Sequence, residues 1–238
     1  MPESGCVDVV TTHVWRVPTR RIPQALIAVA ADRRRIRRTP GVTFAKLLGG
    51  SRSGRFGIRD TDATRWMLIA SWVSADAAHR FDHSSVLSAW TRGAEETWTA
   101  TLRPLATRGR WSRQAAFGCP AYGPWTGPVA AITRGRIRLS QLPVFWRSVR
   151  AINADLVDRD GLCIAFGFGE APIGVQGTFS VWRDSTALTR FAYHGAPHQT
   201  VIAEATRRDW FAEALFARFA VLTTAGTIDG RDPLAGLS

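Results

Sequence analysis

Residues 167–222 contain three sequence words around which the rest of the chain can be interpreted: GFGEAPIGVQGTFSVWRD (167–184), TRFAYHGAPH (189–198) and DWFAEALFARFAVL (209–222). They predict a strand, a short helix, a loop with two histidines, a second helix dense in aromatic residues and a final strand. The histidines, His194 and His198, are four residues apart. Imidazoles among large flat apolar side chains suit a protein that ligates a planar cofactor, and they also suit an ordinary packed core.

A similar arrangement occurs earlier in the chain, which indicates an internal repeat. The words RIPQALIAV and SWVSADAAHRF of the first half resemble QLPVFWRSV and SVWRDSTALTRF of the second. In each half a proline precedes a glycine by 18 residues, and a tryptophan precedes a phenylalanine by 9. The matching anchors are Pro23 and Pro143, Gly41 and Gly161, Trp72 and Trp182, and Phe81 and Phe191.

Each half is predicted to form a βαββαβ unit of the ferredoxin-like kind. The expected strands are Val7–Val17, Val42–Leu48, Arg65–Val73 and Trp98–Thr107, then Val129–Arg138, Leu162–Phe168, Gln176–Trp182 and Phe216–Thr223. The expected first helices are Pro23–Arg37 and Leu142–Leu156. Such a sheet buries one face under its helices, so two units can pair their other faces into one α+β barrel of the dimeric α+β-barrel type. We therefore expect repeats at 1–108 and 128–238, joined by a connector at 109–127.

The two halves are not equal. The first has a longer insert between its middle strands, SRSGRFGIRDTDATR (51–65), which predicts an exposed flexible loop. The second half gains residues after Phe191, and these include both loop histidines. A functional site is therefore expected in the second half.

The composition is that of a globular protein, with 45% hydrophobic and 21% charged residues among 238. No stretch has the length and apolarity of a membrane span, and no secretory signal is evident, so a cytoplasmic protein is expected. The three cysteines are far apart, which predicts neither disulfides nor a zinc site. The net charge of +12 comes almost entirely from scattered arginines. That pattern favours a basic face for an acidic protein partner over nucleic-acid binding, with peripheral membrane contact left open.

Conventional hydrolytic and phosphate-binding motifs are missing from the sequence. There is no G-x-S-x-G and no H-E-x-x-H, and the glycines of FGFGEAPIG (166–174) are expected to form a turn between strands. The absence of these hydrolytic and phosphate-binding motifs favours a protein whose chemistry is that of a bound cofactor. Haem iron accepts a neutral imidazole, which makes His198 the first candidate ligand, with His194 as its competitor and His83 in third place. We expect His13 and His79 to be surface residues of a strand and a helix.

The words GEAPIGVQGTFSVWRD (169–184), FAYHGAPH (191–198), WFAEALFARFAVL (210–222) and GRDPL (230–234) resemble the C-terminal half of the spheroidene monooxygenase family. The likeness is strong from about Val129 to Leu234 and looser before. It implies a haem-containing monooxygenase of carotenoid biosynthesis that uses O2 and electrons from reduced ferredoxin. It also implies a fold related to the dimeric α+β-barrel haem proteins. The family's histidine falls on His198, whereas His194 is a departure from the family pattern.

This reading assigns roles to further residues of the second half. Gln176 is a candidate polar group in the cavity, and Arg190 or Arg218 is a candidate partner of the haem propionates, since the guanidinium fork suits carboxylates. The catalytic candidates are Gln176 and Arg190. The candidate cofactor-binding residues are Phe191, Tyr193, His194, His198, Trp210, Phe216 and Arg218.

Two alternatives remain open. One is another haem enzyme on the same barrel, with a peroxidase-like, dehydratase or haem-degrading activity. The other is a non-enzymatic protein that binds haem or an apolar ligand. The aromatic residues by themselves are also consistent with plain core packing.

Overall fold

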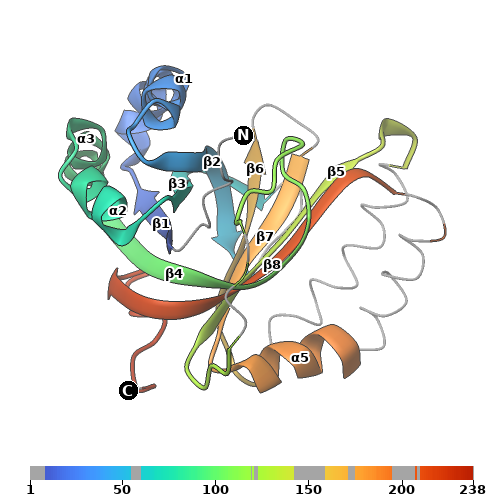
Figure 1. The fold of residues 1–238 in the computed structure, drawn as a ribbon. Helices are drawn as coiled ribbons and strands as arrows, with labels where there is room; N and C mark the ends of the chain where they lie inside the picture. Colours follow the sequence, from blue (N-terminus) through green and yellow to red (C-terminus); the bar gives the residue numbers. More distant parts are fainter. Residues whose placement is uncertain are drawn as a thin grey trace.

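The structure is a computed structural model that describes residues 9–54, 60–118, 120, 123–141, 159–170, 175–194, 207 and 210–237, with only the backbone of 139, 175, 176, 193 and 194. Eight strands of this part of the chain close into an antiparallel barrel in the order β1-β3-β2-β6-β7-β5-β8-β4. Figure 1 shows α1, α2 and α3 gathered on one side of the barrel and α5 on the other. The predicted α+β barrel is therefore confirmed.

The first half supplies four neighbouring strands and three helices. Its elements are β1 (Val9–Arg16), α1 (Ile22–Arg37), β2 (Val42–Ser53), β3 (Thr61–Trp72), α2 (Ala75–Asp82), α3 (Ser85–Gly93) and β4 (Glu96–Gly109), with a short 3-10 turn, η1 (Thr19–Arg21), before α1. Pro23 stands in the first turn of α1, where a missing N–H costs nothing. No helix in the described ranges is long and apolar enough to cross a lipid bilayer.

The second half supplies the other four strands. Its elements are β5 (Val129–Ile137), the 3-10 turn η3 (Leu139–Gln141), β6 (Leu162–Glu170), β7 (Val175–Trp182), α5 (Ser185–His194) and β8 (Phe211–Gly226). The strand order β8-β5-β7-β6 matches β4-β1-β3-β2 of the first half, position for position. The helix expected over Leu142–Leu156 lies outside the described residues, so the tandem ferredoxin-like repeat stays a prediction.

Residues alternate along every strand between the barrel interior and an outer face. The interior is one apolar cluster to which all eight strands contribute, with Trp98, Phe166, Phe179 and Phe219 fully buried in it. The outer face of β1–β4, called here the first outer face, packs under α1, α2 and α3. The outer face of β5–β8, called the second outer face, carries a smaller cluster with Trp182 and Phe191.

Three of the four anchor pairs occupy matching positions. Gly41 and Gly161 have φ of 85° and 81°, and a Cβ on either would lie 2.6 Å from Ala77 Cβ or Ala187 Cβ respectively. Glycine is needed at both places because of the left-handed backbone and the close approach of the helix. The rings of the Trp–Phe pairs lie 5.1 Å apart in each half. The fourth pair is not compared, because Pro143 lies outside the described residues.

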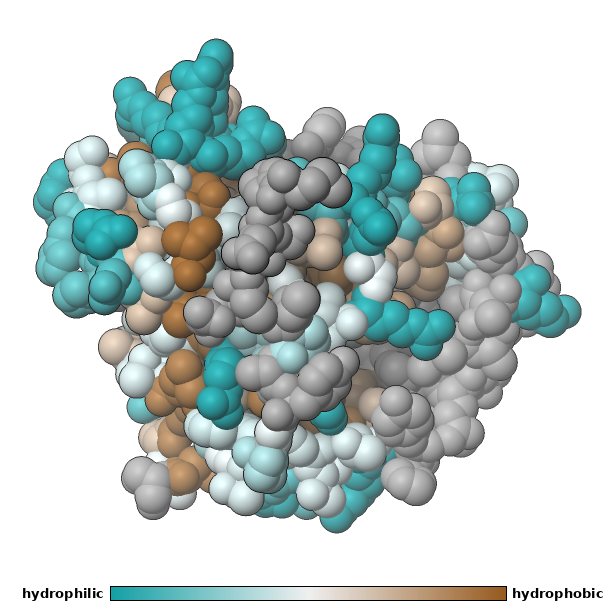
Figure 2. Space-filling model, in the orientation of Figure 1, coloured by the Kyte–Doolittle hydropathy of each residue, from teal (hydrophilic) through white to brown (hydrophobic). Residues whose placement is uncertain are grey.

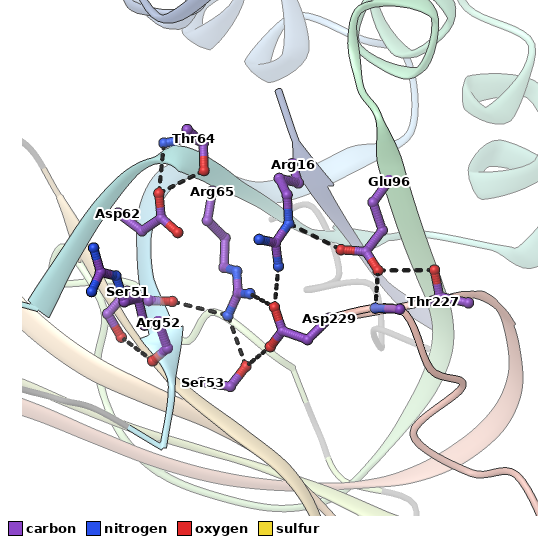
Figure 3. Close-up of polar contacts among 11 residues, drawn as sticks. Arg16, Ser51, Arg52, Ser53, Asp62, Thr64, Arg65, Glu96, Thr227 and Asp229 are labelled. Carbon is purple, nitrogen blue, oxygen red and sulfur yellow. Dashed lines mark hydrogen bonds and ion pairs between the residues drawn. The ribbon is translucent and has the colours of Figure 1, made fainter. Parts of the chain in front are cut away.

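Two polar clusters interlock the halves, one toward each end of β2. At the end marked by Ser53, Arg65 donates to Asp229 at 2.6 Å, and Arg16 pairs with both Asp229 and Glu96 (Figure 3). Burial raises the pKa of Asp229, but the hydrogen bond from Ser53 and the charges of Arg65 and Arg16 outweigh it and hold that pKa below its usual range. These contacts tie β1, β3 and β4 to the turn that follows β8.

The second cluster repeats this arrangement with the halves exchanged. Glu213 of β8 accepts the backbone N–H groups of Ser112 at 3.0 Å and Arg113 at 2.7 Å, and it pairs with the buried Arg134. Glu96 of β4 in the same way accepts the N–H of Gly230 at 2.6 Å. The glutamate near the start of each half's last strand therefore holds the turn that follows the other half's last strand.

Several expectations were wrong in detail. Phe211 and the residues after it belong to β8 rather than to a helix, because they alternate between the interior and the outer face as strand residues do. The insert 51–65 is mostly paired strand: β2 runs on to Ser53, and β3 begins at Thr61. Of that insert, 55–59 lie outside the described residues.

The connector and one histidine also differ from expectation. Trp111 and Phe117, both in the predicted connector 109–127, are fully buried in the barrel interior. His13, expected at the surface of a strand, is only 3% exposed and stacks on Trp15 with ring centroids 5.8 Å apart. Its strand position is an outward one, but α2 covers it, so Phe81 lies against it as well. His79, by contrast, is exposed on α2 as expected.

Candidate functional site

The second outer face is lined by small side chains. Beyond the row that contains Trp182, cross-strand register aligns outward positions in three further rows of four, and these rows run across β6, β7, β5 and β8. Reading from α5 upward, the rows are Ala165, Ser180, Ala131 and Arg218; Gly167, Thr178, Thr133 and Phe216; and Gly169, Gln176, Gly135 and Ala214. Phe216 and Arg218 are the only large side chains of these rows that the structure describes.

The equivalent positions of the first outer face are large. Trp15 lies opposite Trp66 there, and both rings pack against Trp90 of α3 with centroids 5.2 and 6.0 Å away. In the second half the corresponding pair is Gly135 opposite Gln176. A Cβ on Gly135 would come within 2.3 Å of the Phe211 ring, so part of the difference is filled from β8.

The next row shows the same contrast. Leu47 lies opposite Leu68 on the first outer face, and both are buried under the helices. Their counterparts are Gly167 opposite Thr178. Protein interiors are packed to crystal-like density, so volume that the sheet's own side chains give up is filled by other groups. The small side chains of the second outer face therefore leave volume above the sheet that either other segments of the chain or a ligand can fill.

A cationic side chain stands at the edge of these rows of small side chains. Arg218 of β8 is half-buried, opposite Ala131 of β5 and Ala106 of β4. Its Nε atom is buried and has no hydrogen-bond partner within the described chain. A buried guanidinium N–H without a partner is costly unless an acceptor such as a carboxylate reaches it. Arg218 is therefore suited to hold an anionic group of a ligand on this face.

Sequence reasoning missed a second arginine with the same property. Arg103 of β4 lies opposite Ala220, two residues along β8 from Arg218. Its Nε atom is also buried without a partner in the described part, and its guanidinium lies 5.4 Å from the centre of the Trp125 ring. The sequence does show an arginine at an outward position of the last strand of the first half. The barrel order brings that strand, β4, beside β8 of the second half.

Helix α5 covers the lower edge of the second outer face. Asp184 accepts the N–H of Ala187 at 2.8 Å and begins the helix, and the Phe191 ring packs on Trp182 near its other end. The last turn of α5 contains Tyr193 and His194, whose side chains lie outside the described structure. His198 also lies outside it. The geometry therefore neither supports nor opposes the predicted ligands.

The remaining candidates are spread over the half. Gln176 occupies an outward register position near the start of β7. Phe216, 45% exposed, stands beside Thr133 on the same face. Arg190 points toward solvent, with its side chain 62% exposed and 3.5 Å from Asp160. Trp210 is fully buried just before β8 begins. Gln176, Phe216 and Arg218 thus share one face, and Arg190 lies apart from them.

His83 lies in the other half. It follows α2 as its C-terminal cap, exposed, with its ring 5.1 Å from that of His79. Across the described ranges, no three His, Cys, Asp or Glu residues form a group that could hold a metal ion. Burial raises the pKa of the Cys163 thiol to about 11, so this cysteine is protonated at neutral pH.

A polar groove of about 200 Å³ lies between α1 and β2 in the first half. Its lysine, Lys46, donates to Glu170 at 3.0 Å and to Ser112 at 2.7 Å. Glu170 in turn accepts from Trp111 Nε1. The lysine and the glutamate of this groove pair with each other across the two halves, which marks this contact as part of the structural interlock.

The fold places the chain in a class of α+β barrels with a known enzyme example. An aldoxime dehydratase solved with butyraldoxime aligns with a TM-score of 0.63 over 99% of this chain and 86% of that one, at 10% identity. A second aldoxime dehydratase structure gives 0.63 over 100% and 89%, at 11% identity. At these identities the likeness concerns the fold alone. No family model matches the chain.

Curated relatives narrow the class to one family. The spheroidene monooxygenase of Rubrivivax gelatinosus is 39% identical over 194 residues, covering 81% of this chain and 73% of the relative. That of Rhodobacter capsulatus is 32% identical over 225 residues, covering 91% of both. The chain belongs to the spheroidene monooxygenase family, as its sequence words predicted. The names of these relatives indicate a monooxygenase.

Proposed function

We propose that this protein is a haem-dependent monooxygenase that inserts oxygen from O2 into an apolar, carotenoid-like substrate. Family membership supports the reaction class. The observation that carries the location is the second outer face, where Gly135, Gly167 and Thr178 replace the Trp and Leu side chains of the first. An acidic electron donor such as ferredoxin is the partner that the net charge of +12 favours.

The residues present fit a haem group. We propose that the planar group lies against the small outward side chains of the second outer face, and Arg218 supplies a buried donor that a propionate carboxylate would satisfy. Arg103 is proposed to hold the second carboxylate. The ligand to iron is proposed to be His198, with His194 as the competitor, on the family pattern alone. A bound haem supplies the reductive activation of O2 that no side chain can provide.

The chain's own contribution is binding, orientation and exclusion of water. An apolar chain gains by leaving water for the surface formed by Ala131, Ala165 and Phe216. Gln176 is proposed to donate or accept a hydrogen bond beside the reacting part of the substrate. Arg190 remains a candidate for the same region, although its pairing with Asp160 at the surface makes Arg218 the better choice for a buried carboxylate.

The first test is the visible absorption spectrum of the purified protein with added haem. Wild type is expected to show a Soret band, and His198→Ala is expected to lose or shift it. His83→Ala is the matched control, since this exposed histidine lies in the first half. A band that survives His198→Ala and disappears in His194→Ala moves the ligand to α5. No haem binding by wild type overturns the proposal.

The second test is turnover. The haem-loaded enzyme with O2, a reductant and a linear carotenoid is expected to give an oxygenated product, and the same mixture without O2 is expected to give none. Haem binding without oxygen-dependent product would leave a haem protein of another kind and refute the monooxygenase assignment for this chain.

A further inference from the structure

Helix α1 presents two large aliphatic side chains to solvent. Its buried face, with Ala25, Val29 and Ile36, packs on the first outer face. On the outer side, Leu26 is 55% exposed and Ile27 is 71% exposed, the highest value among the exposed large hydrophobic residues of the described chain. Isolated exposed aliphatic residues are common, but here they are adjacent and lie on a helix that covers the barrel.

Arginines flank these two residues on both sides. Arg20 and Arg21 stand six and five residues before Leu26. Further exposed arginines stand in the last turn of the helix and directly after it. Those that follow are Arg34, Arg35, Arg37 and Arg38. In Figure 2 the surface over α1, at the top left, is mostly hydrophilic, with hydrophobic residues visible between.

One carboxylate of the helix pairs with an arginine of this surface, and only with Arg35. The one acidic residue of α1 is Asp32, which is 7% exposed and faces inward. It accepts a hydrogen bond from Trp90 Nε1 at 3.1 Å and one from Arg35 at 3.3 Å. Neither Arg34 nor Arg38 has a carboxylate partner in the described ranges. The outer side of α1 is therefore both apolar in its middle and cationic at its ends.

This combination defines the kind of partner. An acidic protein surface would match the arginines, but it would leave Leu26 and Ile27 against polar groups. An anionic bilayer offers phosphate groups for guanidinium and an acyl boundary for aliphatic side chains at the same surface. The helix is about 24 Å long, enough to lie along a membrane surface with both cationic ends at headgroup level.

We propose that α1 is a membrane-docking helix, which inserts Leu26 and Ile27 into the interface of an anionic bilayer while the flanking arginines contact lipid phosphates. Docking of this kind does not require the cofactor or the reaction proposed above. If the substrate is a carotenoid-like molecule, docking would hold the enzyme against the phase in which that molecule dissolves.

The test is flotation of the full-length protein with vesicles, without haem or substrate. Wild type is expected to float with vesicles of phosphatidylcholine and phosphatidylglycerol and to stay behind with phosphatidylcholine alone. The double variant Leu26→Glu/Ile27→Glu is expected to lower the bound fraction at least tenfold. Leu222→Glu, at a residue 41% exposed on β8, is the matched control and is expected to bind as wild type does.

Two further results decide the outcome. Arg34→Ser/Arg38→Ser is expected to weaken binding as well, which keeps the test open if the first variant proves poorly folded by circular dichroism. No flotation of wild type on anionic vesicles overturns the proposal. Binding that high salt abolishes and that Leu26→Glu/Ile27→Glu leaves unchanged also overturns it, because the surface would then be an electrostatic one suited to an acidic protein.

Discussion

The two outer faces of the barrel share one register but differ in what fills them. On the first, Trp15 and Trp66 pack against Trp90 and close the layer under the helices. On the second, the same two positions are Gly135 and Gln176. Both halves keep the Trp–Phe pair and the glycine against which the helix packs. The scaffold is therefore the same in both halves, and the outward side chains of the sheet are what differ. The large side chains of the first outer face pack directly under its helices, whereas the small ones of the second outer face are the reason why we propose the site there.

The largest expected effect tests whether the second outer face is core. Leu68→Ala is expected to lower the free energy of unfolding by about 2–5 kcal/mol, because it opens a cavity in a closed layer. Thr178→Ala at the equivalent position is expected to cost under about 1 kcal/mol. Urea unfolding of the two variants without haem makes the comparison. Equal losses would mean that the second outer face is packed as tightly as the first, and the proposed site would have to move.

The buried histidine of the first half gives the next effect. Burial lowers the pKa of His13 from 6.5 to about 4. Between these values the unfolded chain binds a proton that the folded chain does not, so stability falls as the pH drops through this window, by about 3 kcal/mol in all. His13→Phe is expected to remove this part of the pH dependence.

Unfolding by urea at about pH 7 and about pH 4.5 measures it, with the exposed His79→Phe as the control. An unchanged difference between the two pH values in His13→Phe would show that His13 takes up its proton in the folded protein. The acidic groups of the interlocks add a separate loss at lower pH, since the pKa of Asp229 is held below its usual range.

Alternation and anchor spacing were enough to predict most of the fold. The strands of both halves, the helix after Pro23 and the closure into a barrel all follow from period-two patterns and from proline and glycine positions. Phe211 was misplaced because a run of aromatics and alanines satisfies both helical and strand periods over a few residues. Trp111 and Phe117 were missed because no local pattern reveals that a connector enters a barrel.

The candidate site was predictable only in part. The added histidines led to the prediction of a site in the second half, which stays a prediction, and Arg103 of the first half lies next to the proposed site through the β4–β8 pairing. The buried clusters around Arg65 and Arg134 depend on partners more than 70 residues away. Such pairings depend on tertiary geometry, which a single sequence does not encode in any local window. The identity of the iron ligand stays a prediction from family resemblance.

A moderate effect on haem affinity distinguishes Arg218 from Arg190 as the partner of the haem propionates. Arg218→Leu is expected to weaken haem binding about tenfold, or ~1.4 kcal/mol, because a buried charge-assisted hydrogen bond to a carboxylate is lost. Arg218→Lys is expected to restore part of the affinity, since the charge remains while the fork is lost. Haem titration followed at the Soret band gives the affinities. A loss in Arg190→Leu with none in Arg218→Leu would place the carboxylates at α5 instead of β8.

The smallest expected effect on stability concerns the N-terminal helix cap that both halves possess. Ser74 caps α2 by accepting the N–H of Ala77 at 3.2 Å, and Asp184 caps α5 by accepting that of Ala187 at 2.8 Å. Either residue changed to alanine is expected to cost about 1 kcal/mol of stability, measured by urea unfolding. Only Asp184→Ala is expected to weaken haem binding as well, because α5 ends at His194, four residues before His198 in the sequence. Equal haem affinity in the two variants would mean that the ligand is held independently of α5, and that the halves differ in their sheet faces alone.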